Sequence, residues 1–372
     1  MPALKSKMNI KTMIILTGTL IAFYIGAGFA TGQEVMQYYA AYGKQFFLPV
    51  IFFIVLFTGA LWSFGNAAAE GNFAKGSDVF YWFGGKYAGK VFDYYTVIFL
   101  SMMLIVMFGG AGSTGQEQFG WDIWTGVLIM AVLVTGTALL GLNRLVDILG
   151  KIGPVIVALI VFVAVVTVIR DADNIKAGME AISSGTVPVK RVGNSFIASG
   201  FSMVGVCLLL FSAFVTELAM VNGRREYNWG VVLSMGAIGL TMLILSLAII
   251  ANIFDMAVME IPTLALAVLI SPALAKVFSV VVFAGIYTTS VPIMWTVAAR
   301  FAEDGTTRSR ILMLVLCAVA VTVALLLPYS NLVNAIYGFG GYLGGLLLFF
   351  MIYKEAKYFI KKIRAKRFVD IA

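Results

Sequence analysis

Apolar positions along the chain gather into ten long runs that are separated by short polar clusters. Most runs reach or exceed the roughly 20 residues that an α-helix needs to cross the hydrocarbon core of a bilayer. The pattern therefore predicts an all-α integral membrane protein with ten transmembrane helices. The spans are expected near residues 12–41, 46–67, 91–113, 122–140, 150–169, 194–221, 229–252, 273–299, 310–327 and 332–353.

Composition supports a membrane protein and argues against an enzyme. Of the 372 residues, 61% are hydrophobic and only 12% are charged, whereas charged residues make up about a quarter of an ordinary soluble chain. The sequence contains no histidine, which is the commonest metal ligand and proton shuttle. No nucleophile–base pair or facing acidic pair is visible within a span. We therefore expect neither an enzyme nor a bound cofactor.

The distribution of basic residues predicts the orientation. With a cytoplasmic N-terminus, 20 of the 26 Lys and Arg residues fall in cytoplasmic loops and tails, as the positive-inside rule requires. We expect a multi-pass protein of the inner (cytoplasmic) membrane with both termini in the cytoplasm. The net charge of +8 is concentrated in these loops and in the basic tail 354–372, which indicates contact with the lipid bilayer and not with nucleic acid.

Loop lengths suggest that the chain consists of two related halves. Long connections join spans 2 and 3 and spans 7 and 8, whereas short ones join spans 1 and 2 and spans 6 and 7. Because five is an odd number, a second set of five spans must be inverted relative to the first. We expect one transporter domain built as a 5+5 inverted repeat, with repeat one at about 9–170, repeat two at about 194–353 and a cytoplasmic tail at 354–372.

The first span contains the stretch YIGAGFATGQE at residues 24–34, which does not suit a continuous membrane helix. Glycine costs about 1 kcal/mol relative to alanine in a helix, and a carboxylate deep in lipid costs several kcal/mol. A break at Gly26 and Gly28 would free backbone carbonyls for a cation and N–H groups for an anionic substrate group. Helix packing through small residues is the alternative, but it gives no role to Gln33 and Glu34.

Several segments resemble known transporters. The stretches GAGFATGQEVMQYYAAYG (26–43) and GGAGSTGQEQFG (109–120) resemble bacterial YkvI-type membrane proteins, which are relatives of the amino acid–polyamine–organocation transporters with a LeuT-type fold. Residues 141–160 resemble the entry to the fifth helix of sodium-coupled neurotransmitter-type transporters. FSAFVTE (211–217) resembles the broken sixth helix of amino acid antiporters. The resemblance implies secondary active transport of a small amino acid or related small amine by alternating access, with helices 1 and 6 broken at the midplane.

The resemblance also implies one sodium ion between the first and eighth helices. The stretch FAGIYTTSVPIMW (283–295) offers a carbonyl followed by hydroxyls at i+3 and i+4. The implied sodium ligands are Ala22, Ile25, Ile286, Thr289 and Ser290. A register one residue earlier, with Gly285, Thr288 and Thr289, meets the same spacing. The alternative is that these hydroxyls bond back to carbonyls of their own helix.

The implied substrate pocket lies between the two predicted breaks and extends to the third helix. Its residues are Gly26, Ala27, Gly28, Phe29, Ser101, Phe211, Ser212, Ala213 and Phe214. No basic residue reaches the midplane, so a dianion is not expected. A zwitterionic amino acid fits such a pocket, and a small organic cation fits nearly as well.

Other mechanisms stay open at this level. Proton coupling would use the membrane-embedded carboxylates Glu34, Glu117 and Glu217 as proton carriers or gates, because burial raises a carboxylate's pKa towards neutrality. A membrane sensor with the same fold but without transport is a further alternative. A channel is less well supported, since no filter motif is visible. Between spans 7 and 8, Pro262 begins an apolar stretch that forms either a helical cap over the outer vestibule or a plain loop.

Overall fold

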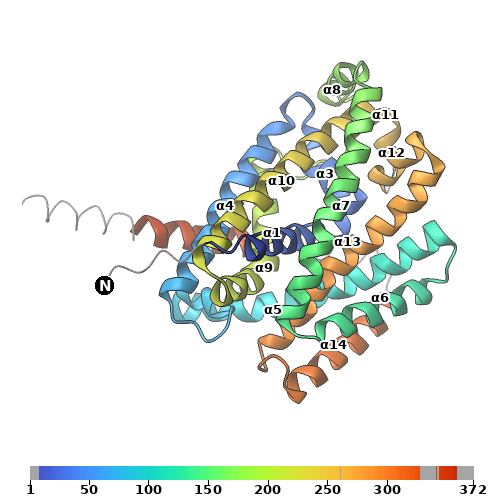
Figure 1. Ribbon diagram of the computed structural model, residues 1–372. Helices are drawn as coiled ribbons and strands as arrows, with labels where there is room; N and C mark the ends of the chain where they lie inside the picture. Colours follow the sequence, from blue (N-terminus) through green and yellow to red (C-terminus); the bar gives the residue numbers. More distant parts are fainter. Residues whose placement is uncertain (1–7, 260, 327–340, 342, 358–372) are drawn as a thin grey trace, which may run out of the picture.

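A computed structural model describes residues 8–259, 261–326, 341 and 343–357. Every element in these ranges is helical (Figure 1). Seven of the described helices are long and apolar enough to cross a membrane, and two shorter apolar helices accompany them. The long helices are α4 (Phe47–Glu70), α5 (Asp78–Phe119), α7 (Leu142–Arg170), α9 (Phe196–Val221), α10 (Arg224–Ala251), α13 (Pro272–Ala299) and α14 (Thr307–Leu326), and the shorter ones are α1 (Ile10–Tyr24) and α6 (Ile123–Ala138).

These helices follow the order of the first nine predicted spans, so the chain is a multi-pass helical membrane protein. The predicted tenth span lies partly outside the described residues, and its described part, 341 and 343–353, is helical. Several helices extend beyond their apolar run: α5 begins at Asp78 instead of near residue 91, with a kink at Gly85 where φ is +67°. Helical hydrogen bonding continues past the hydrophobic boundary, which apolar runs alone cannot reveal. The bounds of the two repeats stay a prediction.

The first span is divided into three short helices. After α1, the chain restarts as α2 (Ala27–Thr31) and α3 (Gln33–Tyr38), and a 3-10 helix, η1 (Ala40–Gln45), follows. The break after Tyr24 confirms the prediction for helix 1. A second break at Gly32, where φ is +83°, was not predicted. Only glycine adopts this left-handed conformation readily.

The predicted break in the sixth span is wrong. Helix α9 is continuous from Phe196 to Val221. The segment 211–214 contains neither glycine nor proline, so no residue there removes a backbone donor or favours a non-helical conformation. The Ser212 hydroxyl donates to the Leu208 carbonyl, and the Thr216 hydroxyl donates to the Ser212 carbonyl at 2.6 Å. Both polar side chains are thereby satisfied within an intact helix.

Helix α1 lies in the middle of the bundle, against α7 and α10 (Figure 1). Its packing on α7 uses glycines: a Cβ atom at Gly153 would lie 2.2 Å from the Gly18 carbonyl oxygen. Small residues at such a crossing allow two membrane helices to approach closely. The packing role considered for Gly26 and Gly28 is therefore performed by Gly18, about two helical turns before the break.

Short helices cover the face that carries the predicted extracellular loops, which is called the outer face below. Helix α8 (Asn174–Ser184) lies in the connector between the halves, beside α11 (Ile253–Met256). Helix α12 (Pro262–Ile270) packs against α2, α7 and α13. The stretch after Pro262 is therefore a helical cap and not a plain loop. The opposite face, with the predicted cytoplasmic loops, is called the inner face.

Candidate functional site

The break in α1 alters the backbone hydrogen bonds at its end. The Gly26 N–H donates to the Tyr24 carbonyl at 2.8 Å, instead of to the Ala22 carbonyl four residues earlier. The helical pattern resumes when the Ala30 N–H donates to the Gly26 carbonyl at 2.9 Å. The Ala22 carbonyl has thus lost the donor that a continuous helix would supply.

Helix α13 lies directly against this break. The Thr289 hydroxyl donates to the Phe23 carbonyl at 3.0 Å. A Cβ atom at Gly285 would lie 3.0 Å from the Ile25 carbonyl oxygen, so the absence of a side chain there lets the two backbones meet. Hydroxyl and carbonyl oxygens that replace a hydration shell form the usual environment of an alkali cation in a membrane protein.

The three α13 hydroxyls do not behave alike. All are buried, but Thr288 donates to the Gly285 carbonyl at 3.1 Å and Ser290 to the Ile286 carbonyl at 2.7 Å. These two bond back to their own helix, as the alternative interpretation expected. Only Thr289, which both sodium registers share, reaches across to α1 in the part of the chain that the structure describes.

A small cavity beside the break, called the central cavity, has a volume of about 20 Å³. This is room for about one water-sized group. Its walls combine one carboxylate with aromatic and sulfur-containing side chains. They include Phe23 and Tyr24 from the end of α1, Glu34 from α3, Met103 and Met107 from α5, Cys207 and Phe211 from α9, and Thr289 from α13.

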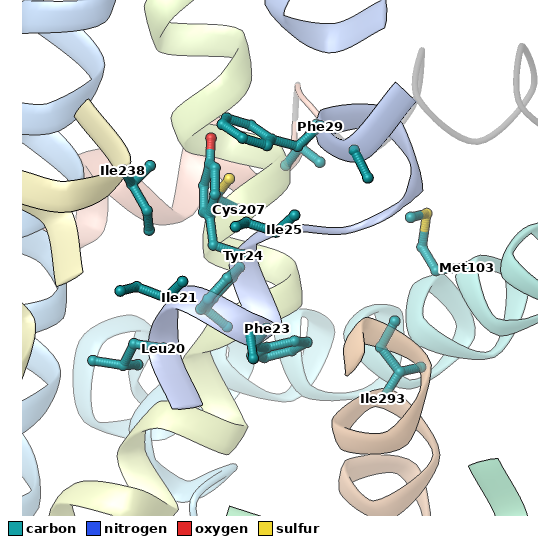
Figure 2. Packing of buried hydrophobic residues seen from close by; sticks show 14 of the residues in the cluster. Leu20, Ile21, Phe23, Tyr24, Ile25, Phe29, Met103, Cys207, Ile238 and Ile293 are labelled. Carbon is teal, nitrogen blue, oxygen red and sulfur yellow. The ribbon is translucent and has the colours of Figure 1, made fainter. Parts of the chain in front are cut away.

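Two buried phenol groups lie next to this cavity. Figure 2 shows Tyr24 extending from the end of α1 towards Phe29 and Cys207. Tyr24 and Tyr39 are close enough to interact electrostatically, yet neither hydroxyl makes a hydrogen bond of normal geometry with a described residue. Buried hydroxyls are usually satisfied, so the pair provides polar atoms that a ligand could use.

A layer of aromatic rings lies between this cavity and the inner face. Phe23 contacts Phe211 with ring centroids 4.3 Å apart, and it contacts Phe214 edge-on at 5.0 Å. Phe214 in turn meets the Trp295 ring at 6.1 Å. Such edge-to-face contacts are favourable beyond simple burial. The layer runs from Phe23 and Phe211, which line the central cavity, to Trp295, which lines the next cavity along the bundle.

This second cavity, called the inner cavity, also measures about 20 Å³. It lies between α9, α13 and the loop before α5, and its lining includes Glu217, Trp295 and Arg300. The Glu217 carboxylate accepts a hydrogen bond from the Gly76 N–H at 2.6 Å. A Cβ atom at Gly76 would lie 2.0 Å from the Ala213 carbonyl oxygen, so the loop is pressed tightly against α9.

A buried ion pair holds one wall of the inner cavity. Both Asp93 carboxylate oxygens accept from the Arg300 guanidinium, at 2.6 and 2.5 Å. The Tyr81 hydroxyl donates to the same carboxylate at 3.0 Å. The hydrogen bonds with Asp93 raise the pKa of Arg300 above its ordinary value, so the guanidinium stays charged. This bidentate geometry orients Arg300 as well as binding it.

The outer side of the break is closed by α12 and the residues before it. The Thr263 hydroxyl donates to the Ala30 carbonyl at 2.6 Å, and the Gln33 amide donates to the Met259 carbonyl at 2.7 Å. A Cβ atom at Gly32 would lie 2.7 Å from the Thr263 side chain. The left-handed turn at Gly32 therefore serves close contact between α2 and the helical cap.

The predicted substrate residues fall into three groups. Gly26 and Phe211 line the central cavity, and Phe29 packs against Tyr24 with ring centroids 5.6 Å apart. Ala213 lines the inner cavity, Phe214 belongs to the aromatic layer and Ser212 bonds back within α9. Ser101 donates to the Val97 carbonyl at 2.8 Å and does not line either cavity. Ala27 and Gly28 form the first turn of α2.

The predicted sodium residues meet only in part. Ile25 and Thr289 lie at the break, where α1 and α13 touch, whereas the Ile286 carbonyl and the Ser290 hydroxyl bond to each other. Ala22 contacts α7 through Gly153. Among the described residues, no group of three or more His, Cys, Asp or Glu side chains is arranged to hold a metal ion.

The predicted carboxylates Glu34 and Glu217 are not brought together. Glu34 lines the central cavity, Glu217 lines the inner cavity, and Glu117 belongs to α5 near its end at Phe119. Sequence reasoning missed Tyr24, Met103, Met107 and Cys207 as cavity residues. Helical spacing could have identified Cys207. Met203, Cys207 and Phe211 follow each other at i+4 and therefore share one face of α9.

Relatives of known sequence agree with the resemblance described above. The chain is 22% identical to the uncharacterised membrane protein YkvI of Bacillus subtilis over 341 residues, which cover 89% of this chain and 93% of YkvI. It is 24% identical to the uncharacterised protein YyaD of the same organism over 152 residues. That match spans 41% of this chain and less than half of YyaD, 43%. No protein-family model matches the chain. The resemblance to YkvI-type proteins is thereby confirmed.

Solved structures agree on the architecture. A Na⁺-coupled sialic acid symporter in a substrate-bound outward-open state superposes with a TM-score of 0.64 at 10% identity, covering 91% of this chain and 78% of the symporter. The chain has a LeuT-type fold. A manganese transporter of Eremococcus coleocola superposes with a TM-score of 0.54 at 15% identity, covering 94% of this chain and 78% of the transporter. At such identities the likeness concerns the fold and does not identify a substrate.

Proposed function

We propose that the protein is a secondary active transporter of a small amino acid or related small amine, which works by alternating access and is coupled to one sodium ion. The observation that carries the proposal is the broken first helix, whose Phe23 carbonyl accepts from Thr289 and beside which Glu34 and Thr289 line the central cavity. Fold and chemistry support each other here, since broken helices around a midplane site are typical of secondary transporters.

The substrate's ammonium group is proposed to lie near Glu34. The central cavity is lined by this carboxylate, by aromatic rings and by methionine side chains, and none of the described residues in its lining is Lys or Arg. An organic cation in such a cavity gains both ion pairing and cation–π attraction. Helix α2 has only five residues, so its N-terminus offers a substrate carboxylate much less than a long half-helix would.

The coupling sodium ion is proposed to bind at Ala22, Ile25, Ile286, Thr289 and Ser290. Support comes from the freed carbonyl of Ala22 and from the contact between Thr289 and the break. In the bound form, Ser290 would exchange its hydrogen bond with Ile286 for the ion. The protein is proposed to lie in the inner membrane with both termini in the cytoplasm, as its basic loops indicate.

Proton coupling is the second candidate. Glu34 and Glu217 line the two cavities on either side of the aromatic layer, so each carboxylate faces a different compartment of the same pathway. A proton carried by these residues would need no sodium. This mechanism would make substrate binding depend on pH and leave it indifferent to the choice of sodium or potassium.

The test is the melting temperature of the purified protein with a panel of amino acids and small amines, run once in sodium and once in potassium. A ligand that binds only the folded state raises the melting temperature. A hit that requires sodium, followed by sodium-driven uptake of the same compound into proteoliposomes, is the expected result. An equal hit in both salts would reject sodium coupling, and binding without flux would indicate a sensor.

A further inference from the structure

The inner cavity contains three polar atoms that the fold leaves without partners. They are the Ser77 hydroxyl, the Trp295 indole N–H and the Thr296 hydroxyl, and none has a hydrogen-bond partner among the described residues. Their residues are 6%, 3% and 6% exposed and all line the cavity. Buried polar groups without partners are rare and costly. Three such atoms around one small space are available to bind a ligand.

The chemistry of these atoms identifies the kind of group they would bind. An indole N–H can only donate, and both hydroxyls can donate. Lys75 and Arg300 belong to the same lining, where the Lys75 ammonium group donates to the Arg300 carbonyl at 3.3 Å and the Arg300 guanidinium is bound by Asp93. A carboxylate accepts several hydrogen bonds, so it can satisfy all three donors. This wall of the inner cavity is therefore suited to a carboxylate.

Glu217 provides an acceptor for a positively charged group in the same cavity. Its carboxylate accepts one hydrogen bond, at 2.6 Å, from the Gly76 N–H, and the residue belongs to the lining of the same cavity. A carboxylate oxygen pair has about four acceptor positions. Glu217 can therefore also receive an ammonium group. The central cavity, in contrast, has Glu34 but no basic residue among the described residues of its lining.

We propose that the inner cavity is a second binding site, which takes the zwitterionic head group of an α-amino acid. Ser77, Trp295 and Thr296 bind the carboxylate, and Glu217 binds the ammonium group. This inference rests on the proposed function, because it makes the cavity a station for the transported molecule between the central cavity and the inner face. It also favours an amino acid over a simple amine as the substrate.

The size of the cavity couples binding to movement of the loop before α5. With about 20 Å³, the space holds one water-sized group, so an amino acid enters only when Lys75 and Gly76 move away from α9. Because the loop carries the Gly76 N–H, this movement breaks its hydrogen bond with the Glu217 carboxylate. The head group therefore binds when the loop is released from α9.

The experiment uses glycine as the minimal zwitterionic probe, with methylamine and acetate as probes for each half. Binding is followed by the difference in tryptophan fluorescence between the wild-type protein and Trp295→Phe. We expect saturable binding of glycine and at least tenfold weaker binding of methylamine and acetate. Thr296→Val should weaken glycine binding by about tenfold, the cost of one lost hydrogen bond to a charged group. Thr135→Val is the matched control, since Thr135 is also 6% exposed and also lacks a partner, but lies on α6 outside both cavities.

Two further results separate this inference from the proposed function. Glu34→Gln should impair uptake and leave the Trp295 response to glycine intact. If Glu34→Gln abolishes that response, or if glycine leaves Trp295 fluorescence unchanged in wild-type protein, the inner cavity is no separate amino acid site and the inference is overturned. If glycine binds as expected but no amino acid or amine enters proteoliposomes, the site stands and the proposed function fails.

Discussion

Thr289 offers the sharpest test of sodium binding, because its hydroxyl is the α13 group that reaches the broken first helix. Thr289→Val keeps the shape of the side chain and removes the hydrogen bond of 3.0 Å to the Phe23 carbonyl. In potassium, the variant should lose about 1–3 kcal/mol of stability, the usual cost of leaving a buried polar group without its partner.

The sodium-dependent part of the stability can be calculated separately. At a sodium concentration ten times Kd, an ion that binds only the folded state adds about 1.4 kcal/mol. Wild-type protein should show this gain when sodium replaces potassium at constant ionic strength, and Thr289→Val should show none. The measurement is thermal unfolding of the purified protein across a series of sodium concentrations.

Two neighbouring variants serve as controls and decide the register. Thr288→Val removes an equally buried hydroxyl that bonds only within α13, and Ser290→Ala removes the other one. If the ligands are Ile286, Thr289 and Ser290, then Thr288→Val keeps the sodium effect and Ser290→Ala reduces it. The reverse result selects the register with Thr288. A full sodium effect in Thr289→Val would refute the site altogether.

Three further outcomes are expected. Glu34→Gln should weaken binding of the substrate amine by at least tenfold in a melting assay, the loss of one charged hydrogen bond; unchanged affinity would remove Glu34 from the site. Gly76→Ala should increase hydrogen exchange around Ala213, because its Cβ would lie 2.0 Å from that carbonyl oxygen; wild-type protection would contradict this. Arg300→Met should cost about 3–5 kcal/mol by leaving a buried carboxylate unpaired, and adding Asp93→Leu should restore most of it in chemical unfolding.

The helix breaks show where sequence reasoning succeeded and where it failed. Gly26 marked the break in the first span because glycine weakens a helix wherever it stands. The break expected near Ser212 came from resemblance alone, and the segment has no residue that interrupts a helix, so α9 stays intact. Gly32 also ends a helix, but its role depends on close contact with Thr263 of α12, which the local sequence does not contain.

The sequence identified some residues of the candidate site and missed others. The sequence identified Glu34, Glu217 and Thr289 as unusual, since a polar group at membrane depth needs a reason. It could not tell that the two glutamates line different cavities. It also gave no role to Trp295 or Thr296, because an isolated tryptophan or threonine in an apolar run looks like ordinary packing.

By itself, the sequence determined that the protein is a helical membrane protein, the order of nine described helices and the place where the first one breaks. These are local properties, since apolar length and glycine position act on the residues nearby. Only the tertiary structure decided which side chains share a cavity, which hydroxyl of α13 reaches α1 and which polar atoms remain without partners. Those outcomes depend on contacts between residues hundreds of positions apart, such as Phe23 and Thr289, and such contacts exist only once the helices have packed.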